Sequence, residues 1–234
     1  MNIKTVKIII ASILFFLFSN ASAEDGGVSI KQTRVIFSAS DKAQSLTVTN
    51  QGLNSYLIHV RIFNDVEMKQ PAKFLVTPPL SLLKSHSQQT LRILSPTDIL
   101  LTDQESVYYV GILAVPSQNI NDNAKSAPKI NLGFRFVVKL FFRPKNLEEQ
   151  SEEEGCKLKF SANDDGYSIF NPTPYFKTLG RLVINNEEIK LSYVSSMIDP
   201  EGTRQYKHEK PTHNVEWNTI DDYGGLSRSC KLKL

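Results

Sequence analysis

The sequence predicts an all-β protein with two domains, and three observations carry that prediction. From residue 28 onward, apolar residues recur mostly with the period of two that β-strands require, not with the 3.6-residue period of helices. Turn-forming stretches such as Asn50-Gln-Gly52 and Pro78-Pro79 separate the short apolar runs. The length of 234 residues suits one large domain or two of ordinary size.

The N-terminal 23 residues have the pattern of a secretory signal peptide. Lys4 and Lys7 precede an apolar stretch at 8–18, and Ala21-Ser22-Ala23 provides the small residues of a cleavage site. A membrane anchor is the alternative, but the eleven residues of this stretch, rising about 1.5 Å each, are too short for a bilayer core of about 30 Å. We therefore expect cleavage after Ala23 and export of the mature chain.

The mature chain is almost neutral. The full sequence carries 27 Lys and Arg against 24 Asp and Glu, a net charge of +3, and removing Lys4 and Lys7 leaves 25 against 24, or +1. Nucleic-acid binders usually concentrate positive charge to neutralise phosphates. The composition therefore argues against a strongly basic nucleic-acid binder.

The first domain is expected to be an antiparallel sandwich of immunoglobulin type. Alternating runs, or runs of β-branched and aromatic residues, predict about seven strands over roughly 120 residues. The clearest strands are expected at 46–49, 56–63, 91–93, 107–115 and 130–142. We place the boundary after Arg143-Pro144, so that domains of residues 24–145 and 146–234 follow the signal peptide at 1–23.

An acidic stretch opens the second domain. Residues 145–155 contain five glutamates and almost no apolar residue, which is typical of a solvated linker or loop. Beyond it, strands are expected at 158–160, 167–170, 179–184 and 189–193, with Trp217 in the core. A domain of about 80 residues has a marginal core, so a covalent link would matter for its stability.

The two cysteines, Cys156 and Cys230, favour such a link. An even pair in an exported protein points to a disulfide more than to a metal or catalytic site. The sequence does not show whether their Cα atoms come within the roughly 4.4–6.8 Å that a disulfide needs. The pairing therefore remains a prediction at this point.

The segment 130–142 is the most informative part of the chain. Every second residue is apolar, and thirteen residues at about 3.3 Å each would extend about 43 Å, far longer than an average strand. A domain of this size has difficulty covering the whole apolar row, so the N-terminal half is expected to project near a sheet edge. The alternative is an ordinary long strand whose apolar face is fully covered. The row consists of Ile130, Leu132, Phe134, Phe136, Val138, Leu140 and Phe142.

Six stretches, taken together, resemble the PapD-like periplasmic pilus (fimbrial) chaperones of the chaperone–usher pathway. Each is weak alone, but their order and spacing are specific, and they cover essentially the whole mature chain. They are 28–37, Thr77-Pro78-Pro79, 103–109, 139–144, Asn171-Pro-Thr-Pro-Tyr175 and Asp221-Asp222-Tyr-Gly-Gly225.

The resemblance implies two immunoglobulin-like domains set as an L with a cleft between them. It assigns Arg34 and Lys139 to that cleft, where they would bind the C-terminal carboxylate of a pilin subunit. A carboxylate accepts charge-assisted hydrogen bonds from both a guanidinium and an ammonium group, so the chemistry is consistent. Without the resemblance, two unrelated cations on a solvated face would be the simpler interpretation.

The resemblance also assigns the long strand and a charged network. Ile130, Leu132, Phe134 and Phe136 would be donor residues that complete the subunit's unfinished sandwich. Arg92, Glu105 and Asp222 would form a charged network between the domains. The alternative for these three is a set of independent surface charges, each worth at most about 1 kcal/mol.

The resemblance thus implies a periplasmic chaperone that delivers pilin subunits to an outer-membrane usher, with no metal or nucleotide. The rivals are an exported adhesion or structural module without a subunit client, and a secreted hydrolase, for which no catalytic constellation is visible. Whether the free protein forms a self-capping dimer stays open. The loop-length branch of the family also stays open, because the segment 117–129 is longer than in the short-loop branch but lacks the cysteine pair of the long-loop branch.

Overall fold

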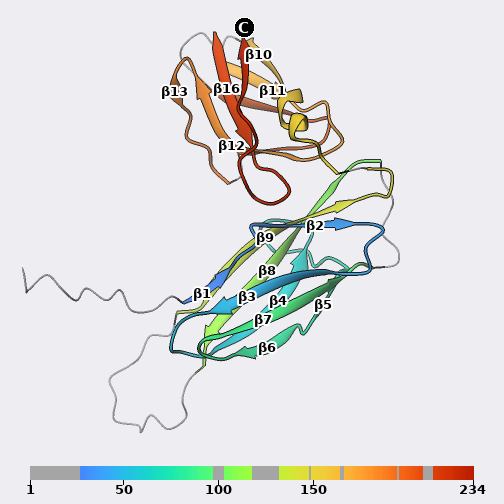
Figure 1. Cartoon of the computed structure of the whole chain (residues 1–234), viewed down its shortest axis with the longest axis vertical. Coiled ribbons are helices and arrows are strands. Elements are labelled where there is room, and N and C mark those ends of the chain that lie inside the picture. Colours follow the sequence, from blue (N-terminus) through green and yellow to red (C-terminus); the bar gives the residue numbers. More distant parts are fainter. Residues whose placement is uncertain are drawn as a thin grey trace, which may run out of the picture.

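The computed structural model describes residues 27–96, 103–117, 132–147, 149–163, 166–193, 195–207 and 213–234. The expected signal peptide, Ile130 and nearly all of the 117–129 loop lie outside these residues. Within them the chain is almost entirely β-strand, and Figure 1 shows two domains set at an angle as the arms of an L. The predicted all-β fold class is confirmed.

The first domain is a sandwich of two sheets around one core. One sheet has the order β1-β3-β7-β5 and the other β2-β9-β8-β4-β6. Phe37, Leu46, Ile58, Leu91 and Leu140 are fully buried between them. The strands are β1 (Val28–Ile30), β2 (Arg34–Ser38), β3 (Gln44–Asn50), β4 (Tyr56–Phe63), β5 (Leu75–Thr77), β6 (Leu80–Leu83), β7 (Ser87–Leu94), β8 (Ser106–Pro116) and β9 (Phe134–Arg143).

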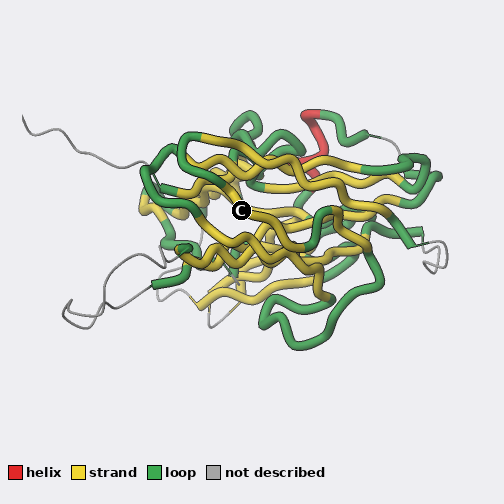
Figure 2. Tube along the Cα trace, turned by 90° about the horizontal axis from the view of Figure 1, so that it is seen from below, coloured by secondary structure: helices red, strands yellow, loops and turns green. Residues whose placement is uncertain are grey.

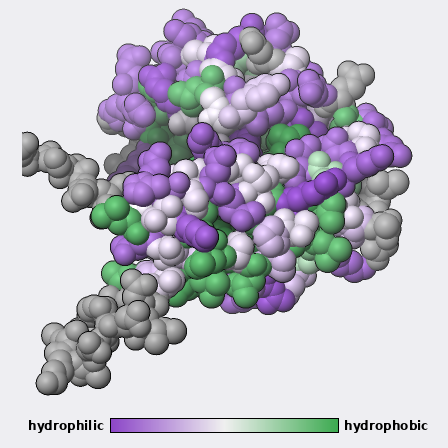
Figure 3. Space-filling view, turned by 60° about the horizontal axis from the view of Figure 1, so that its bottom comes forward, coloured by the Kyte–Doolittle hydropathy of each residue, from purple (hydrophilic) through white to green (hydrophobic). Residues whose placement is uncertain are grey.

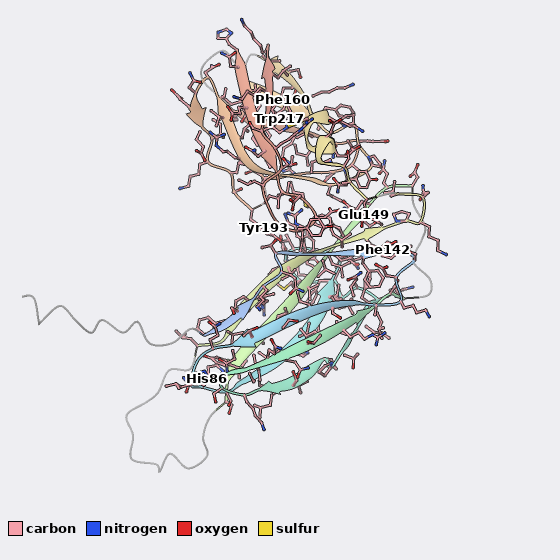
Figure 4. All side chains as sticks on the ribbon, in the orientation of Figure 1. His86, Phe142, Glu149, Phe160, Tyr193 and Trp217 are labelled. Carbon is pink, nitrogen blue, oxygen red and sulfur yellow. A yellow bond between two sulfur atoms is a disulfide. The ribbon has the colours of Figure 1, made fainter. Side chains whose placement is uncertain are left out.

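The second domain has its own core, built on Trp217, which packs against Phe160 with 4.5 Å between ring centroids (Figure 4). One sheet has the order β10-β11-β15; the other is β13-β12-β16-β17, with β14 also paired to β12. A short 3₁₀ helix, η1 (Glu152–Lys157), is the helical segment visible in Figure 2. The strands are β10 (Lys159–Asn163), β11 (Gly166–Phe170), β12 (Lys177–Ile184), β13 (Glu187–Glu188), β14 (Met197–Ile198), β15 (Thr203–Lys207), β16 (Asn214–Thr219) and β17 (Cys230–Lys233).

Strand β9 is paired along its length on one side only. β8 pairs with it in antiparallel register from Phe134 to Phe142, whereas β2 pairs with it in parallel from Lys139 to Arg143. On the β2 side, no strand among the described residues pairs with 134–138. This stretch, called the open edge below, therefore leaves one side of its backbone unpaired.

Two local expectations for the second domain were wrong. Residues 189–193 form no strand, because Ser192 and Ser195 bond each other's backbone N–H groups through their hydroxyls and close a turn instead. Part of the acidic stretch is not a solvated loop but η1, whose Gly155 is buried and accepts a hydrogen bond from Trp217 Nε1 at 2.9 Å. Packing against the core thus overrides the local charge pattern.

The disulfide that the cysteines predicted is present. Cys156 in η1 and Cys230 in β17 are bonded, with 5.4 Å between their Cα atoms. Cys230 is the register partner of Trp217, so the bond closes over the core of the second domain. It joins the beginning of that domain to its end.

Candidate functional site

Arg34 and Lys139 are neighbours on one sheet face. They are register partners in the parallel pairing of β2 with β9. Because side chains alternate along a strand, and the adjacent Val35 and Leu140 are buried in the core, Arg34 and Lys139 point to the opposite face. That face meets the second domain, where Phe141 contacts Phe176 with 5.9 Å between ring centroids.

The Arg34 guanidinium is held between the two domains. Its Nη1 donates a hydrogen bond to the backbone oxygen of Ile220 at 3.1 Å, and its Cζ lies 5.4 Å from the centre of the Phe141 ring. Its Nε is buried without a partner among the described residues. Burial lowers the pKa of Arg34, although the charges of Asp222 and Asp221 oppose that shift.

Lys139 is a buried ammonium group without a carboxylate partner in the described part of the chain. Its relative exposure is 7%, and its Nζ lies 4.5 Å from the centre of the Tyr193 ring. Burial, and secondarily the charge of Arg34, lowers the pKa of Lys139 to about 8. A buried charge normally has a counter-charge, and an anion bound beside Lys139 would supply one.

The pair can bind one carboxylate group. A carboxylate has two oxygens and about four acceptor sites, while Arg34 offers five N–H donors and Lys139 three. Within the described structure, one donor of Arg34 is used by Ile220 and no acceptor is bonded to Lys139. A cleft of 520 Å³ runs beside Arg34, lined also by Arg143 and Asp222, but Lys139 does not line it. The cleft therefore exposes Arg34, while Lys139 lies beside it under the second domain.

The interdomain network is built around Arg143, not around Arg92 as the resemblance implied. Arg143 Nε donates to Glu105 Oε1 at 2.7 Å, and its two terminal nitrogens donate to both Asp222 oxygens at 2.7 and 2.6 Å. Arg92 is exposed on β7, in the other sheet, opposite Ser45 and Thr77. The two carboxylates lie where the resemblance placed them, and their partner is the arginine that ends β9.

This network bonds the two domains to each other. Glu105 Oε2 also accepts a hydrogen bond from the backbone N–H of Phe176 at 2.9 Å, so it contacts both domains. Burial raises the pKa of Glu105, and Arg143 opposes that shift. The Asp222 turn lies next to Ile220, whose oxygen holds Arg34. The network therefore lies beside the residue that holds Arg34.

Lys177 extends the network and was not predicted from the sequence. This lysine at the start of β12 is buried, donates to Gln150 Oε1, and lies over the Tyr175 ring at 5.3 Å. Gln150 in turn donates to Asp222 Oδ1 at 3.4 Å. A lysine at the first position of an apolar strand could have signalled a buried charge, but its partners are far away in sequence.

The predicted donor residues continue the core row of β9 beyond the core. Phe136 is half-buried and packs against the core cluster, while Phe134 and Leu132 are 50% and 67% exposed. Ile130 lies outside the described residues. Figure 3 shows hydrophobic residues gathered in patches on the surface of the first domain. The open edge thus combines unpaired backbone with exposed apolar side chains.

The fold and the cleft define a two-domain immunoglobulin-like protein, and the chain belongs to the pili assembly chaperone family. Residues 27–148 match the family described as pili and flagellar-assembly chaperone, PapD N-terminal domain, and residues 154–231 match the pili assembly chaperone PapD, C-terminal domain. The chaperone protein FocC of Escherichia coli is 34% identical over 229 residues, covering 95% of this chain and 96% of FocC. FimC of Escherichia coli K12 is 31% identical over 223 residues, covering 94% and 90%.

Solved structures agree with this family. The structure of the Salmonella enterica SafA pilin in complex with the SafB chaperone matches with a TM-score of 0.79 and 27% identity, covering 91% of this chain and 99% of that chain. The Escherichia coli chaperone DraB matches with a TM-score of 0.77 and 26% identity, covering 89% and 97%. In the described ranges, no helix is long and apolar enough to span a membrane and no metal-binding group of His, Cys, Asp or Glu occurs.

Proposed function

We propose that this protein is a periplasmic chaperone that binds pilin subunits and delivers them to an outer-membrane usher. The observation that carries the proposal is the buried Lys139 beside Arg34, which has no carboxylate partner among the described residues and lies where the open edge of β9 ends. The family supports it, as does the SafB relative, which is seen in complex with a pilin. The signal peptide at 1–23 would direct export of the chain to the periplasm and would be removed by cleavage.

The anchor would hold the subunit by its last residue. The C-terminal carboxylate would accept hydrogen bonds from Arg34 and Lys139, which replace the water lost on burial with charged donors. The subunit's last strand would then pair with the open edge, and Leu132, Phe134 and Phe136 would fill its groove. The binding work needs no catalytic group, metal or nucleotide, so we assign no enzymatic activity.

The donor row gives a first prediction. Leu132→Ser and Phe134→Ser should each weaken pilin binding about tenfold or more, because burying such a side chain contributes roughly 1.5–3 kcal/mol. Both side chains are exposed in the free protein, so its melting temperature should barely change. Titration of purified chaperone with pilin measures the effect. Leu75→Ser, at a leucine 65% exposed on β5, the edge strand of the other sheet, is the matched control, and an equal loss there would contradict the assignment.

The lowered pKa of Lys139 gives a second prediction. Binding a carboxylate requires the protonated ammonium, and above its pKa of about 8 the free protein holds that form in a falling fraction. The dissociation constant should therefore rise about tenfold between pH 7 and pH 9. Titrations at both values measure it. Lys139→Arg, which stays charged, should show a flat profile; the same slope in both proteins would assign the titration to another group.

Co-expression tests the function as a whole. The chain is produced in a periplasm with pilin subunits encoded near its own gene and recovered by affinity capture. We expect a one-to-one complex that is lost with Arg34→Glu or Lys139→Glu, while both variants keep the wild-type melting temperature within a few degrees. Pilins that fold and persist without this chain would instead favour an exported adhesion or structural module.

A further inference from the structure

Tyr193 is an aromatic residue of the second domain placed directly over the anchor of the first. Its ring centre lies 4.5 Å from Lys139 Nζ, and Figure 4 shows it at the junction of the domains. The ring is 48% exposed, whereas the lysine beneath it is 7% exposed. Tyr193 therefore accounts for part of the burial of the ammonium group and lies between that group and solvent.

The second domain holds Tyr193 in this position through several hydrogen bonds. Ser196 Oγ donates to the Tyr193 backbone oxygen at 3.2 Å, and the N–H of Leu179 in β12 donates to the oxygen of Ser196 at 2.7 Å. Tyr206 in β15 donates its hydroxyl to the oxygen of Ser195 at 2.6 Å. Both sheets of the domain thus hold the turn, and the position of the ring over Lys139 depends on how the two domains are set relative to each other.

The Tyr193 hydroxyl has no hydrogen-bond partner in the described ranges, and its ring already contacts the cation. Burial, with a smaller contribution from Tyr109, raises the pKa of Tyr193 to about 12, so the phenol remains a proton donor at neutral pH. A carboxylate bound to Arg34 and Lys139 has acceptor sites left for a third donor. An aromatic face over an ammonium stabilises that charge while no anion is present.

We propose that Tyr193 is a third residue of the carboxylate anchor, contributed by the second domain. Its ring covers the Lys139 ammonium in the free protein, and its hydroxyl donates a hydrogen bond to the subunit's C-terminal carboxylate in the complex. This inference rests on the proposed function, since it requires a client that ends in the cleft. It makes the anchor complete only when both domains are in place.

The test uses the pilin recovered by co-expression, in its native form and with a Gly-Ser extension that moves the terminal carboxylate. Tyr193→Phe should weaken binding of the native pilin about tenfold, as the loss of one hydrogen bond to a charged group predicts. It should leave binding of the extended pilin unchanged. A merely structural role for Tyr193 would weaken binding of both forms equally, and unchanged binding of the native pilin would overturn the proposal.

The two forms of pilin also separate this inference from the function on which it rests. If wild-type protein binds native and extended pilin equally well, or captures no pilin, the carboxylate anchor itself fails. If only the native form binds tightly and Tyr193→Phe matches wild type, the anchor stands and Tyr193 is not part of it.

A measurement without pilin tests whether the Tyr193 ring shields the Lys139 amine from solvent. At pH 8 the Lys139 amine should react with an acetylating reagent several-fold faster in Tyr193→Ala than in wild type, because the ring no longer shields it, as mass spectrometry of the labelled peptide would show. Tyr193→Phe keeps the ring and should react at the wild-type rate. Equal rates in all three proteins would contradict the cover.

Discussion

Replacing Arg143 by methionine should lower the free energy of unfolding by about 3–5 kcal/mol, the range expected when one partner of a buried ion pair is removed. The substitution leaves Glu105 and Asp222 facing each other without the guanidinium that bonds both. Glu105 is nearly inaccessible, so water cannot replace the lost bonds. Loss of the two bonds from Arg143 to Asp222 removes a direct link between the domains, which should loosen the angle between them.

Urea unfolding measures the first effect and small-angle scattering the second. The matched control is Arg92→Met, an exposed arginine of the same domain, which should change stability by no more than about 0.5 kcal/mol. Adding Glu105→Gln and Asp222→Asn to Arg143→Met should recover part of the loss, because the buried charges are then removed together. If Arg92→Met is as damaging as Arg143→Met, the network does not hold the domains.

Removing the disulfide by Cys156→Ala with Cys230→Ala should destabilise the second domain by about 4 kcal/mol, the chain-entropy value for the loop closed by a sequence separation of 74 residues. A domain with so small a core should then be close to its unfolding threshold at 37 °C. The bond ties η1 to the strand beside Trp217, so its loss should be felt at that ring.

Trp217 is the only tryptophan in the chain, so its fluorescence reports this domain selectively. The urea midpoint should fall in the double variant and, to the same extent, in wild-type protein treated with dithiothreitol. The double variant should not respond to the reductant, which is the control. A wild-type midpoint that is insensitive to reduction would show that the disulfide contributes little.

The strands of the first domain could be predicted because each pattern has a single physical interpretation. The β-branched and aromatic runs at 56–63 and 107–115 give β4 and β8 to within a residue at each end. The strand expected at 130–142 is β9, which begins only at Phe134, so the described Leu132 precedes the strand. The apolar row longer than its domain correctly indicated exposed apolar residues at that end. Residues 189–193 failed because their apolar residues are separated by serines whose hydroxyls bond the local backbone.

The alternation of apolar residues could not identify the arginine of the interdomain network. Arg92 and Arg143 both lie on strands and both flank apolar residues, so alternation alone does not say which arginine faces the second domain. The sheet order decides it, since β8 and β9 pair so that Arg143 emerges beside Glu105. The position of Arg143 immediately before Pro144, at the end of the domain, was the signal that could have identified it.

The contacts of Tyr193 and Lys177 could not be predicted from the sequence for a related reason. Each acts on a residue in the other domain or in the linker, and such contacts follow from the interdomain angle, which no local period encodes. The cysteine pairing had the same limit: oxidising export favoured a bond, but only the fold brings η1 beside β17.

The short length of β2 has a consequence for how a client is aligned. β2 begins at Arg34, opposite Lys139, and runs parallel to β9, so a strand lying on the open edge with its carboxylate in the cleft must run in the same direction and end where β2 begins. The position of its last residue then fixes which residues of the client strand pair with which residues of β9, whatever the length of the client chain before that strand. One extra C-terminal residue would turn every apolar side chain of that strand to the wrong face. Under the proposed function, the C-terminus of the pilin sets the register of its last strand on β9. Unrelated pilins can therefore share this chaperone provided that the sequences of their final few residues are similar.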